Sequence, residues 1–211
     1  MTVFFIVFFL LTLDRIIVEG ANLFVTQQAR LVLEKRGVIL IRDSSANKGG
    51  VTSSSLEVLA GLALNEDEYV NLMMYKDGKP SEFYNNYVKD IQDIIASNAT
   101  LEFNCIWKEH QRLNGQESRT IISDKLSSTL NKLQLELESS DSLFRDIERR
   151  KKVLAKAMPK TLVEYVGIDT LIERLPESYQ KALFACQISR FCYTYGPAAS
   201  QVEFYLYMSQ F

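Results

Sequence analysis

A strand–helix–strand pattern near the start of the chain constrains its fold more than any other feature. Ile16-Ile17-Val18 is a short apolar run that ends in polar and small residues, which is typical of a buried parallel strand leaving a sheet. Apolar side chains at helical spacing between Thr26 and Arg36 predict a helix that ends at Gly37, and Val38-Ile39-Leu40-Ile41 predicts a second strand. Together these segments predict one right-handed βαβ unit of a parallel sheet.

Polar residues follow each predicted strand. Asn22 comes after the first strand, and Asn47 lies in the segment from Asp43 to Gly50 after the second strand. Gly49 and Gly50 have no side chains and allow a ligand to approach the backbone, so we interpret this segment as a ligand-facing loop. Parallel sheets bind ligands at the carboxyl ends of their strands, where we expect both asparagines.

A further helix is expected after the two glycines. Ser54, three residues before Glu57, fits a capping box that begins a helix, and the apolar side chains of that helix are Val58, Leu59, Leu62 and Leu64. The free N–H groups and the dipole at such a helix start favour an anion. We therefore predict that an anion-binding helix start lies beside the two strand ends.

Two ordered motifs resemble the coenzyme-binding domain of glutamate dehydrogenases. Glu19-Gly20-Ala21-Asn22 matches the family's EGAN, and the segment NKGGVTSSSLEVLAGLALN, which starts at Asn47, matches N-x-GGV-x-x-S-x-x-E. The run between residues 18 and 64 looks most like the large NAD-specific fungal form. Segments farther along agree with that form: Leu101-Glu102-Phe103, Leu113-Asn114-Gly115, Asn131-Lys132-Leu133 and Leu175-Pro176-Glu177-Ser178-Tyr179. The resemblance therefore runs from about residue 15 to residue 195.

The resemblance implies a fold and an activity. The fold is α/β, with the C-terminal part of a Rossmann-like dinucleotide-binding domain over residues 14–65 and a mainly α-helical C-terminal region over residues 66–211. The activity is that of an oxidoreductase of amino-acid catabolism, which uses NAD for the oxidative deamination of L-glutamate to 2-oxoglutarate and ammonia. Because the family assembles as homo-oligomers, we expect the full-length enzyme to be one.

The resemblance also implies the site residues. Gly20, Asn22 and Asn47 would lie beside the nicotinamide-ribose end of NAD, where an amide can donate to and accept from ribose hydroxyls. Val51 would pack against substrate glutamate, and Ser54 would donate to its side-chain carboxylate. Without the resemblance, an asparagine at a strand end is more often a turn residue, and a serine before a helix is more often a plain N-cap. The hydroxyls at positions 53 and 55 leave the register of the serine open.

The chain lacks other parts of such an enzyme. None of its nine glycines forms Gly-x-Gly-x-x-Gly, the pyrophosphate-binding turn. The family's substrate-domain lysines and catalytic aspartate belong to segments upstream of the matched run. We therefore assign no catalytic residue here and interpret Lys48 as a loop lysine. We expect this fragment to have little or no activity alone.

The first thirteen residues depart from the family pattern. They contain an apolar run from Phe4 to Leu11, which is shorter than the about 20 residues that span a membrane. The run also lacks the basic start and small-residue exit of a signal peptide. We interpret residues 1–13 as foreign sequence joined to a genuine C-terminal segment, with a targeting signal or a buried strand as alternatives. A different hypothesis for the whole chain is a helical interaction or regulatory module without catalysis, associated with a membrane through this run.

Composition argues against several kinds of protein and site. A net charge of −2 argues against a nucleic-acid-binding surface. A single histidine excludes a multi-histidine metal site, and we interpret His110 as a surface helix residue. Cys105, Cys186 and Cys192 form no Cys-x-x-Cys pair, which indicates reduced, mostly buried thiols. We therefore expect an intracellular protein, cytoplasmic or mitochondrial, with no bound metal and with membrane association disfavoured.

Beyond residue 65 the pattern predicts helices. A first apolar series begins at Tyr84, with a candidate break at Ser97-Asn98, and Asn114-Gly115 marks a turn. A second series keeps one apolar stripe from Leu126 to Met158, with gaps near residues 140 and 151. Because its seam is interrupted, the second series favours an antiparallel helical pair packed on the enzyme over an independent coiled coil.

Prolines and glycines delimit the last predicted helices. Pro159 stops the second apolar series, and Thr161 to Glu164 fits another capping box. Pro176 suits the first turn of a last helix that runs through Tyr195 and ends at Gly196-Pro197.

Overall fold

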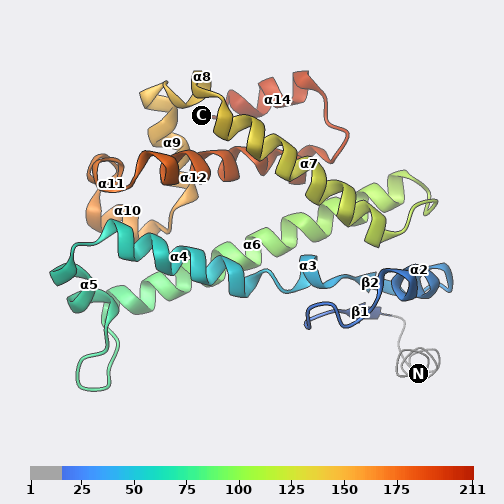
Figure 1. The fold of residues 1–211 in the computed structure, drawn as a ribbon, viewed down its shortest axis with the longest axis horizontal. Coiled ribbons are helices and arrows are strands. Elements are labelled where there is room, and N and C mark those ends of the chain that lie inside the picture. Colours follow the sequence, from blue (N-terminus) through green and yellow to red (C-terminus); the bar gives the residue numbers. More distant parts are fainter. Residues whose placement is uncertain (1–15) are drawn as a thin grey trace.

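The structure, a computed structural model, describes residues 16–211, so the interpretation of residues 1–13 as foreign sequence falls outside it. The described part is mostly helical, with one small sheet of two strands (Figure 1). In chain order the elements are β1 (Ile16–Val18), α2 (Gln27–Lys35), β2 (Ile39–Ile41), α3 (Asp43–Ala46), α4 (Gly49–Ala63), α5 (Glu66–Met73), α6 (Glu82–Arg112), α7 (Arg119–Ser139), α8 (Asp141–Phe144), α9 (Ile147–Ala157), α10 (Lys160–Val166), α11 (Ile168–Arg174), α12 (Glu177–Ser189), α13 (Phe191–Tyr195) and α14 (Gln201–Met208). No helix within residues 16–211 combines the length and the apolar character that a membrane crossing needs.

The predicted strand–helix–strand pattern is confirmed by β1, α2 and β2. The two strands are parallel, and Ile17 pairs with Leu40 in their register. Thr26 caps α2, because its hydroxyl accepts a hydrogen bond from a backbone N–H of the first turn at 3.3 Å. Leu33, Val38 and Leu40 form a small buried core inside this unit. The unit lies at one end of the molecule, opposite α5 (Figure 1).

The segment after β2 is helical, so its interpretation as a loop is wrong, and so is the predicted helix start. Residues 43–46 form α3, and α4 begins at Gly49, five residues before Ser54. The Ser54 hydroxyl caps no helix start; it donates to the Gly50 carbonyl at 3.0 Å within α4. A serine inside a helix can return its hydroxyl to a carbonyl of the preceding turn, so the serine run continues the helix. Gly49 lies beside Ile95 of α6, so the first turn of α4 is already packed.

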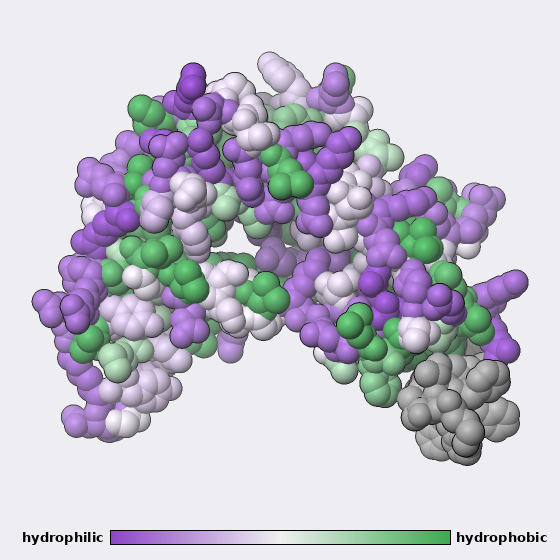
Figure 2. Space-filling model, viewed as in Figure 1, coloured by the Kyte–Doolittle hydropathy of each residue, from purple (hydrophilic) through white to green (hydrophobic). Residues whose placement is uncertain are grey.

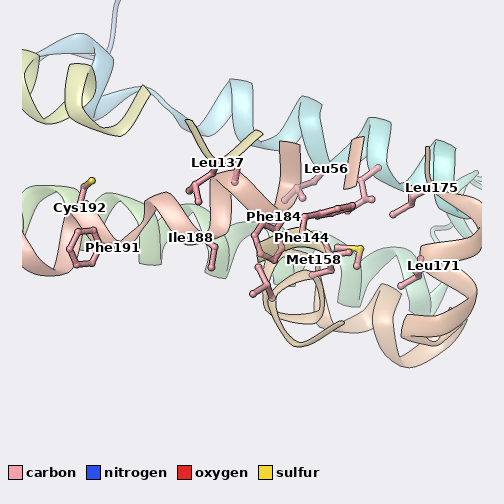
Figure 3. Close-up of a cluster of buried hydrophobic side chains, with 14 of the residues drawn as sticks. Leu56, Leu137, Phe144, Met158, Leu171, Leu175, Phe184, Ile188, Phe191 and Cys192 are labelled. Carbon is pink, nitrogen blue, oxygen red and sulfur yellow. The ribbon is translucent and has the colours of Figure 1, made fainter. Parts of the chain in front are cut away.

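The main hydrophobic core lies in the helical part of the molecule. α12 packs against both α7 and α9, and α6 packs against α4 and α7. Leu56 of α4 belongs to the same buried cluster as Phe144 and Phe184, and all three are labelled in Figure 3. Phe184 is 2% exposed, and its ring meets the Phe144 ring edge-on with ring centres 5.6 Å apart. α4 is therefore built into the helical core and not into the small core of the βαβ unit.

The boundaries of the middle helices differ from the predictions. α6 continues through Ser97-Asn98, so the predicted break is wrong; α4, α10 and α13 pack against this helix and support it. The stripe from Leu126 to Met158 is divided among α7, α8 and α9. Ser140 has an extended backbone after α7, and Asp146 caps α9 by accepting a backbone N–H at 3.1 Å. Local backbone geometry therefore interrupts the apolar repeat.

The last helices follow the predictions in part. α9 ends before Pro159, and Gly196, with a φ of 85°, ends α13 as predicted. The capping box at Thr161 is wrong, because α10 begins one residue earlier and the Thr161 N–H donates to the Asp90 carboxylate of α6 at 2.6 Å. The predicted last helix is two helices, α12 and α13, and α14 follows them.

All three cysteines are free thiols. Cys105 and Cys192 are buried, and Cys186 is exposed, so the prediction of mostly buried thiols holds for two of the three. Burial raises the pKa of Cys105 to about 11 and the pKa of Cys192 to about 11. Because nucleophilic attack needs the thiolate, these two protonated thiols are weak nucleophiles at neutral pH.

Candidate functional site

The two asparagines that follow the strands lie together at the carboxyl ends of β1 and β2. The side-chain amide of Asn47 donates to the side-chain oxygen of Asn22, and it donates to the Gly20 carbonyl at 3.2 Å. Asn47 also ends α3, where its backbone N–H donates to the Asp43 carbonyl at 2.9 Å. Asn22 is exposed and Asn47 is half-buried. Asn22 and Asn47, which we call the asparagine pair, therefore form a small polar site with Gly20.

Three buried charged side chains connect the ends of the two strands. Arg30 of α2 donates to both carboxylate oxygens of Glu19, at 2.8 Å from Nε and at 2.6 Å from Nη2. The same Nη2 lies 3.1 Å from a carboxylate oxygen of Asp43. The side chains of Arg30 and Glu19 are each 3% exposed, and that of Asp43 is 7% exposed. Sequence reasoning missed this cluster, which we call the buried ion triad.

Asp43 holds the chain just after Asn22. The Leu23 N–H donates to the Asp43 carboxylate at 2.8 Å, and Leu23 has a φ of 56°, which is uncommon for a residue with a side chain. Burial raises the pKa of the Asp43 carboxyl. Hydrogen bonds from the Leu23 and Ser44 N–H groups, together with the charges of Arg30 and Arg42, lower that pKa by more than burial raises it. The pKa of Asp43 therefore lies below its usual value. The ionised carboxylate therefore keeps the turn after Asn22 in place.

Lys48 lies in the turn between α3 and α4, and its side chain is anchored. It is the N-cap of α4, and its ammonium group contacts the buried carboxylate of Glu102 on α6 and lies 3.5 Å from the Tyr193 hydroxyl of α13. The Tyr193 hydroxyl donates to the same carboxylate at 3.3 Å. Burial, and then the Glu102 charge, raise the pKa of Tyr193. Lys48 directly follows Asn47, so these contacts hold the backbone beside Asn47 against the helical core.

Val51 and Ser54 lie in the first two turns of α4, and both are exposed. The Val51 side chain is 76% exposed although it is apolar. The Ser54 hydroxyl donates to a carbonyl of its own helix, as do those of Ser53 and Ser55. The three hydroxyls therefore have the same local bonding, and the register of the serine stays a prediction.

A cavity lies away from the asparagine pair, at the turn between α6 and α7. It has a volume of about 360 Å³, and Glu34, His110 and Arg119 are among its lining residues. His110 is a half-buried helix residue whose Nδ1 lies 2.7 Å from the Glu117 carbonyl, so it supports the turn. The Glu34 carboxylate accepts the Arg119 N–H at 2.8 Å and thereby holds α2 against the start of α7.

Comparisons with known proteins identify relatives of this chain. The Glutamate/Leucine/Phenylalanine/Valine dehydrogenase family matches residues 12–113. Glutamate dehydrogenase 2 of Dictyostelium discoideum is 51% identical over 194 residues, which make up 92% of this chain and 18% of that protein. The NAD-specific glutamate dehydrogenase of Neurospora crassa is 47% identical over 196 residues, again 92% of this chain and 18% of that protein. This chain is homologous to a portion of the NAD-specific glutamate dehydrogenases.

The glutamate dehydrogenase match includes the asparagine pair. Residues 12–113 contain Gly20, Asn22, Asn47, Val51 and Ser54. The probable NAD-specific glutamate dehydrogenase of Schizosaccharomyces pombe is 45% identical over 194 residues, 92% of this chain and 17% of that protein. The chain thus spans less than one fifth of the length of these relatives. No solved structure matches it.

Proposed function

We propose that this chain forms one wall of the coenzyme and substrate site of an NAD-dependent glutamate dehydrogenase. The observation that carries the proposal is the contact between Asn22 and Asn47 at the carboxyl ends of two parallel strands. Sheets of this kind bind dinucleotides at that place. The names of the relatives supply the coenzyme and the substrate, since those from Neurospora crassa and Saccharomyces cerevisiae are NAD-specific glutamate dehydrogenases.

The proposed reaction is the oxidative deamination of L-glutamate. In that reaction bound NAD would take up a hydride from the α-carbon of glutamate, and water would release ammonia and 2-oxoglutarate from the oxidised product. The residues of this chain bind and orient the reactants, and the acid–base groups belong to other segments of the enzyme. Such orientation lowers the barrier because it replaces a bimolecular encounter by a fixed geometry.

The strand ends suit a ribose. Within residues 16–211, the side-chain amide nitrogen of Asn22 and the side-chain oxygen of Asn47 have no protein hydrogen-bond partner. One can donate to a ribose hydroxyl and the other can accept from one. A Cβ atom at Gly20 would have no neighbour within 4 Å, so protein packing does not require a glycine there. Close approach of a ligand to the backbone explains the glycine.

The start of α4 suits the substrate. Val51 is the apolar side chain that this turn exposes, and we assign it to the aliphatic part of glutamate. Ser54 lies one turn farther along the same helix, and we assign its hydroxyl to the side-chain carboxylate of glutamate. Backbone N–H groups at the start of a helix add to the attraction for that carboxylate.

The proposal extends to the fold and the assembly of the whole enzyme. Ile16 and Val18 of β1 are 59% and 63% exposed, and a sheet of two strands is marginally stable alone. We assign both strands to the C-terminal part of a Rossmann-like domain over residues 14–65, followed by the helical region over residues 66–211. The whole enzyme is a homo-oligomer of the cytoplasm or mitochondria.

The isolated chain is expected to bind NAD weakly or undetectably. The pyrophosphate-binding turn, which supplies much of the dinucleotide site, is absent from its sequence. Titration of the purified 211-residue chain with NAD, followed by calorimetry, measures this. Tight binding would contradict this prediction, because it would mean that the chain holds a complete NAD site without the pyrophosphate-binding turn.

Ser54→Ala is expected to weaken glutamate binding more than NAD binding. The measurement needs a complete enzyme, such as the Neurospora crassa relative with its matching portion replaced by this chain, which we call the chimeric enzyme. Loss of one hydrogen bond to a carboxylate is worth about 1.5 to 3 kcal/mol, so we expect the KM for glutamate to rise roughly 10- to 100-fold. The KM for NAD should change little.

Ser53→Ala and Ser55→Ala are the matched controls for Ser54→Ala. Each removes a hydroxyl with the same bond to its own helix. Both control variants should keep the kinetics of the parent. Unchanged glutamate kinetics in Ser54→Ala would remove Ser54 from the site, and an effect at position 53 or 55 would move the contact to that hydroxyl.

A further inference from the structure

Arg30 lies at the centre of the contacts that surround the asparagine pair. Its guanidinium group bonds both oxygens of Glu19, at 2.8 and 2.6 Å, and lies 3.1 Å from Asp43. Glu19 extends β1, because its N–H donates to the Ile41 carbonyl of β2 at 2.9 Å. Asp43 begins α3. Arg30 therefore joins the end of one strand to the segment that follows the other.

Both carboxylates that Arg30 contacts lead to the asparagine pair. Glu19 precedes Gly20, whose carbonyl accepts the Asn47 amide. Asp43 accepts the Leu23 N–H, and Leu23 directly follows Asn22. The Asp43 carbonyl also accepts the backbone N–H of Asn47 at 2.9 Å. The Arg30 guanidinium group thus contacts the carboxylates of both segments that hold the asparagine pair, Glu19 before Gly20 and Asp43 before Asn47.

We propose that Arg30 is a positioning residue of the dehydrogenase site, which holds Asn22 and Asn47 in register for the coenzyme. Burying three charges is rarely more stabilising than packing apolar side chains of the same size. The apolar core of the βαβ unit, around Leu33, lies one turn away on α2 and supplies the packing. The buried ion triad instead fixes the relative orientation of the segments that carry Glu19 and Asp43, because a planar guanidinium meets a carboxylate in a defined geometry. The role in coenzyme binding rests on the proposed function, whereas the placement of the two asparagines by Arg30 rests on the contacts alone.

The test uses the side-chain amide signals of Asn22 and Asn47 in NMR spectra of the 211-residue chain. In Arg30→Met the signal of the Asn47 amide should move to the position of a free amide, because its acceptors are no longer held. In Arg30→Lys the charge remains but a single ammonium cannot span both carboxylates, so a partial shift is expected. If the Arg30→Met variant does not fold, the amide signals of the Arg30→Lys variant alone test the proposal. Unchanged signals in the folded variants would overturn the proposal.

Leu33→Ala is the matched control, since it destabilises the same helix without touching the triad. Its asparagine signals should stay at the parent positions; an equal shift would show that Arg30 is only structural and would also overturn the proposal. In the chimeric enzyme, Arg30→Lys should raise the KM for NAD about tenfold and change kcat less than about twofold. Shifted asparagine signals with unchanged kinetics would support the positioning and contradict the proposed function, so the two failures are distinguishable.

Discussion

Asn47→Ala in the chimeric enzyme is expected to weaken NAD binding roughly 10- to 100-fold. The substitution removes the contact with Asn22, the hydrogen bond to the Gly20 carbonyl and the proposed contact with the coenzyme ribose. The ribose and Asn22 contacts are the two of these three hydrogen bonds that bear on the coenzyme, and together they are worth about 1 to 3 kcal/mol, which corresponds roughly to that range of dissociation constants. Equilibrium titration of the enzyme with NAD measures it directly.

Asn131→Ala is the control for Asn47→Ala. Asn131 is exposed on α7, and neither the site nor the core contains it. The Asn131→Ala enzyme should match the parent enzyme in NAD affinity and in folding. If Asn47→Ala also keeps the parent affinity, the asparagine pair has no part in coenzyme binding.

Phe184→Ala is expected to lower the free energy of unfolding of the chain by about 3 to 5 kcal/mol. Phe184 is buried in the main core, and its ring packs against that of Phe144 (Figure 3). Truncation of a buried phenylalanine removes apolar contact and leaves a cavity that the surrounding helices fill only partly. Because typical domains are stable by only about 5 to 15 kcal/mol, the loss is a large fraction of the total. Urea titration followed by circular dichroism measures it.

Tyr205→Ala provides the comparison for Phe184→Ala. Tyr205 is 75% exposed on α14, and its loss should change the free energy of unfolding by less than about 0.5 kcal/mol. A loss below about 1 kcal/mol in Phe184→Ala would mean that α12 does not hold α7 and α9 together in solution.

The sequence predicts the βαβ unit well because each of its signals is local. Thr26 is the cap residue of α2, Gly37 follows its end, and the strands on either side are apolar and β-branched. The same local reasoning fails at Ser54, because a serine that caps a helix and a serine that continues one look alike in sequence. Packing of Gly49 against α6 decides between them, and that contact lies 46 residues away.

Only the two asparagines of the candidate site were predictable from the sequence. Asn22 and Asn47 follow strands, and parallel pairing of those strands brings them together. The partners that hold them are spread through the chain: Lys48 meets Glu102 and Tyr193, which α6 and α13 supply. An arginine on the inner face of a crossover helix, between acidic residues at two strand ends, is a signal that could have revealed the triad.

Hydrophilic residues are spread over the face shown in Figure 2, and apolar groups are scattered among them. Val51, Val58 and Leu62 are nevertheless exposed on α4, and Ile16 and Val18 on β1. In the proposed enzyme, the substrate and the remaining strands of the sheet would cover these side chains. These five exposed apolar positions thus lie on the elements to which we assign ligand and sheet contacts.

The most direct test of the central claim is a crystal structure of the chimeric enzyme with NAD bound. The claim is that two amides at the ends of parallel strands bind the nicotinamide half of the coenzyme. We expect a ribose hydroxyl within about 2.7 to 3.2 Å of a side-chain atom of Asn22 or Asn47. A bound coenzyme whose ribose contacts neither asparagine would contradict the account.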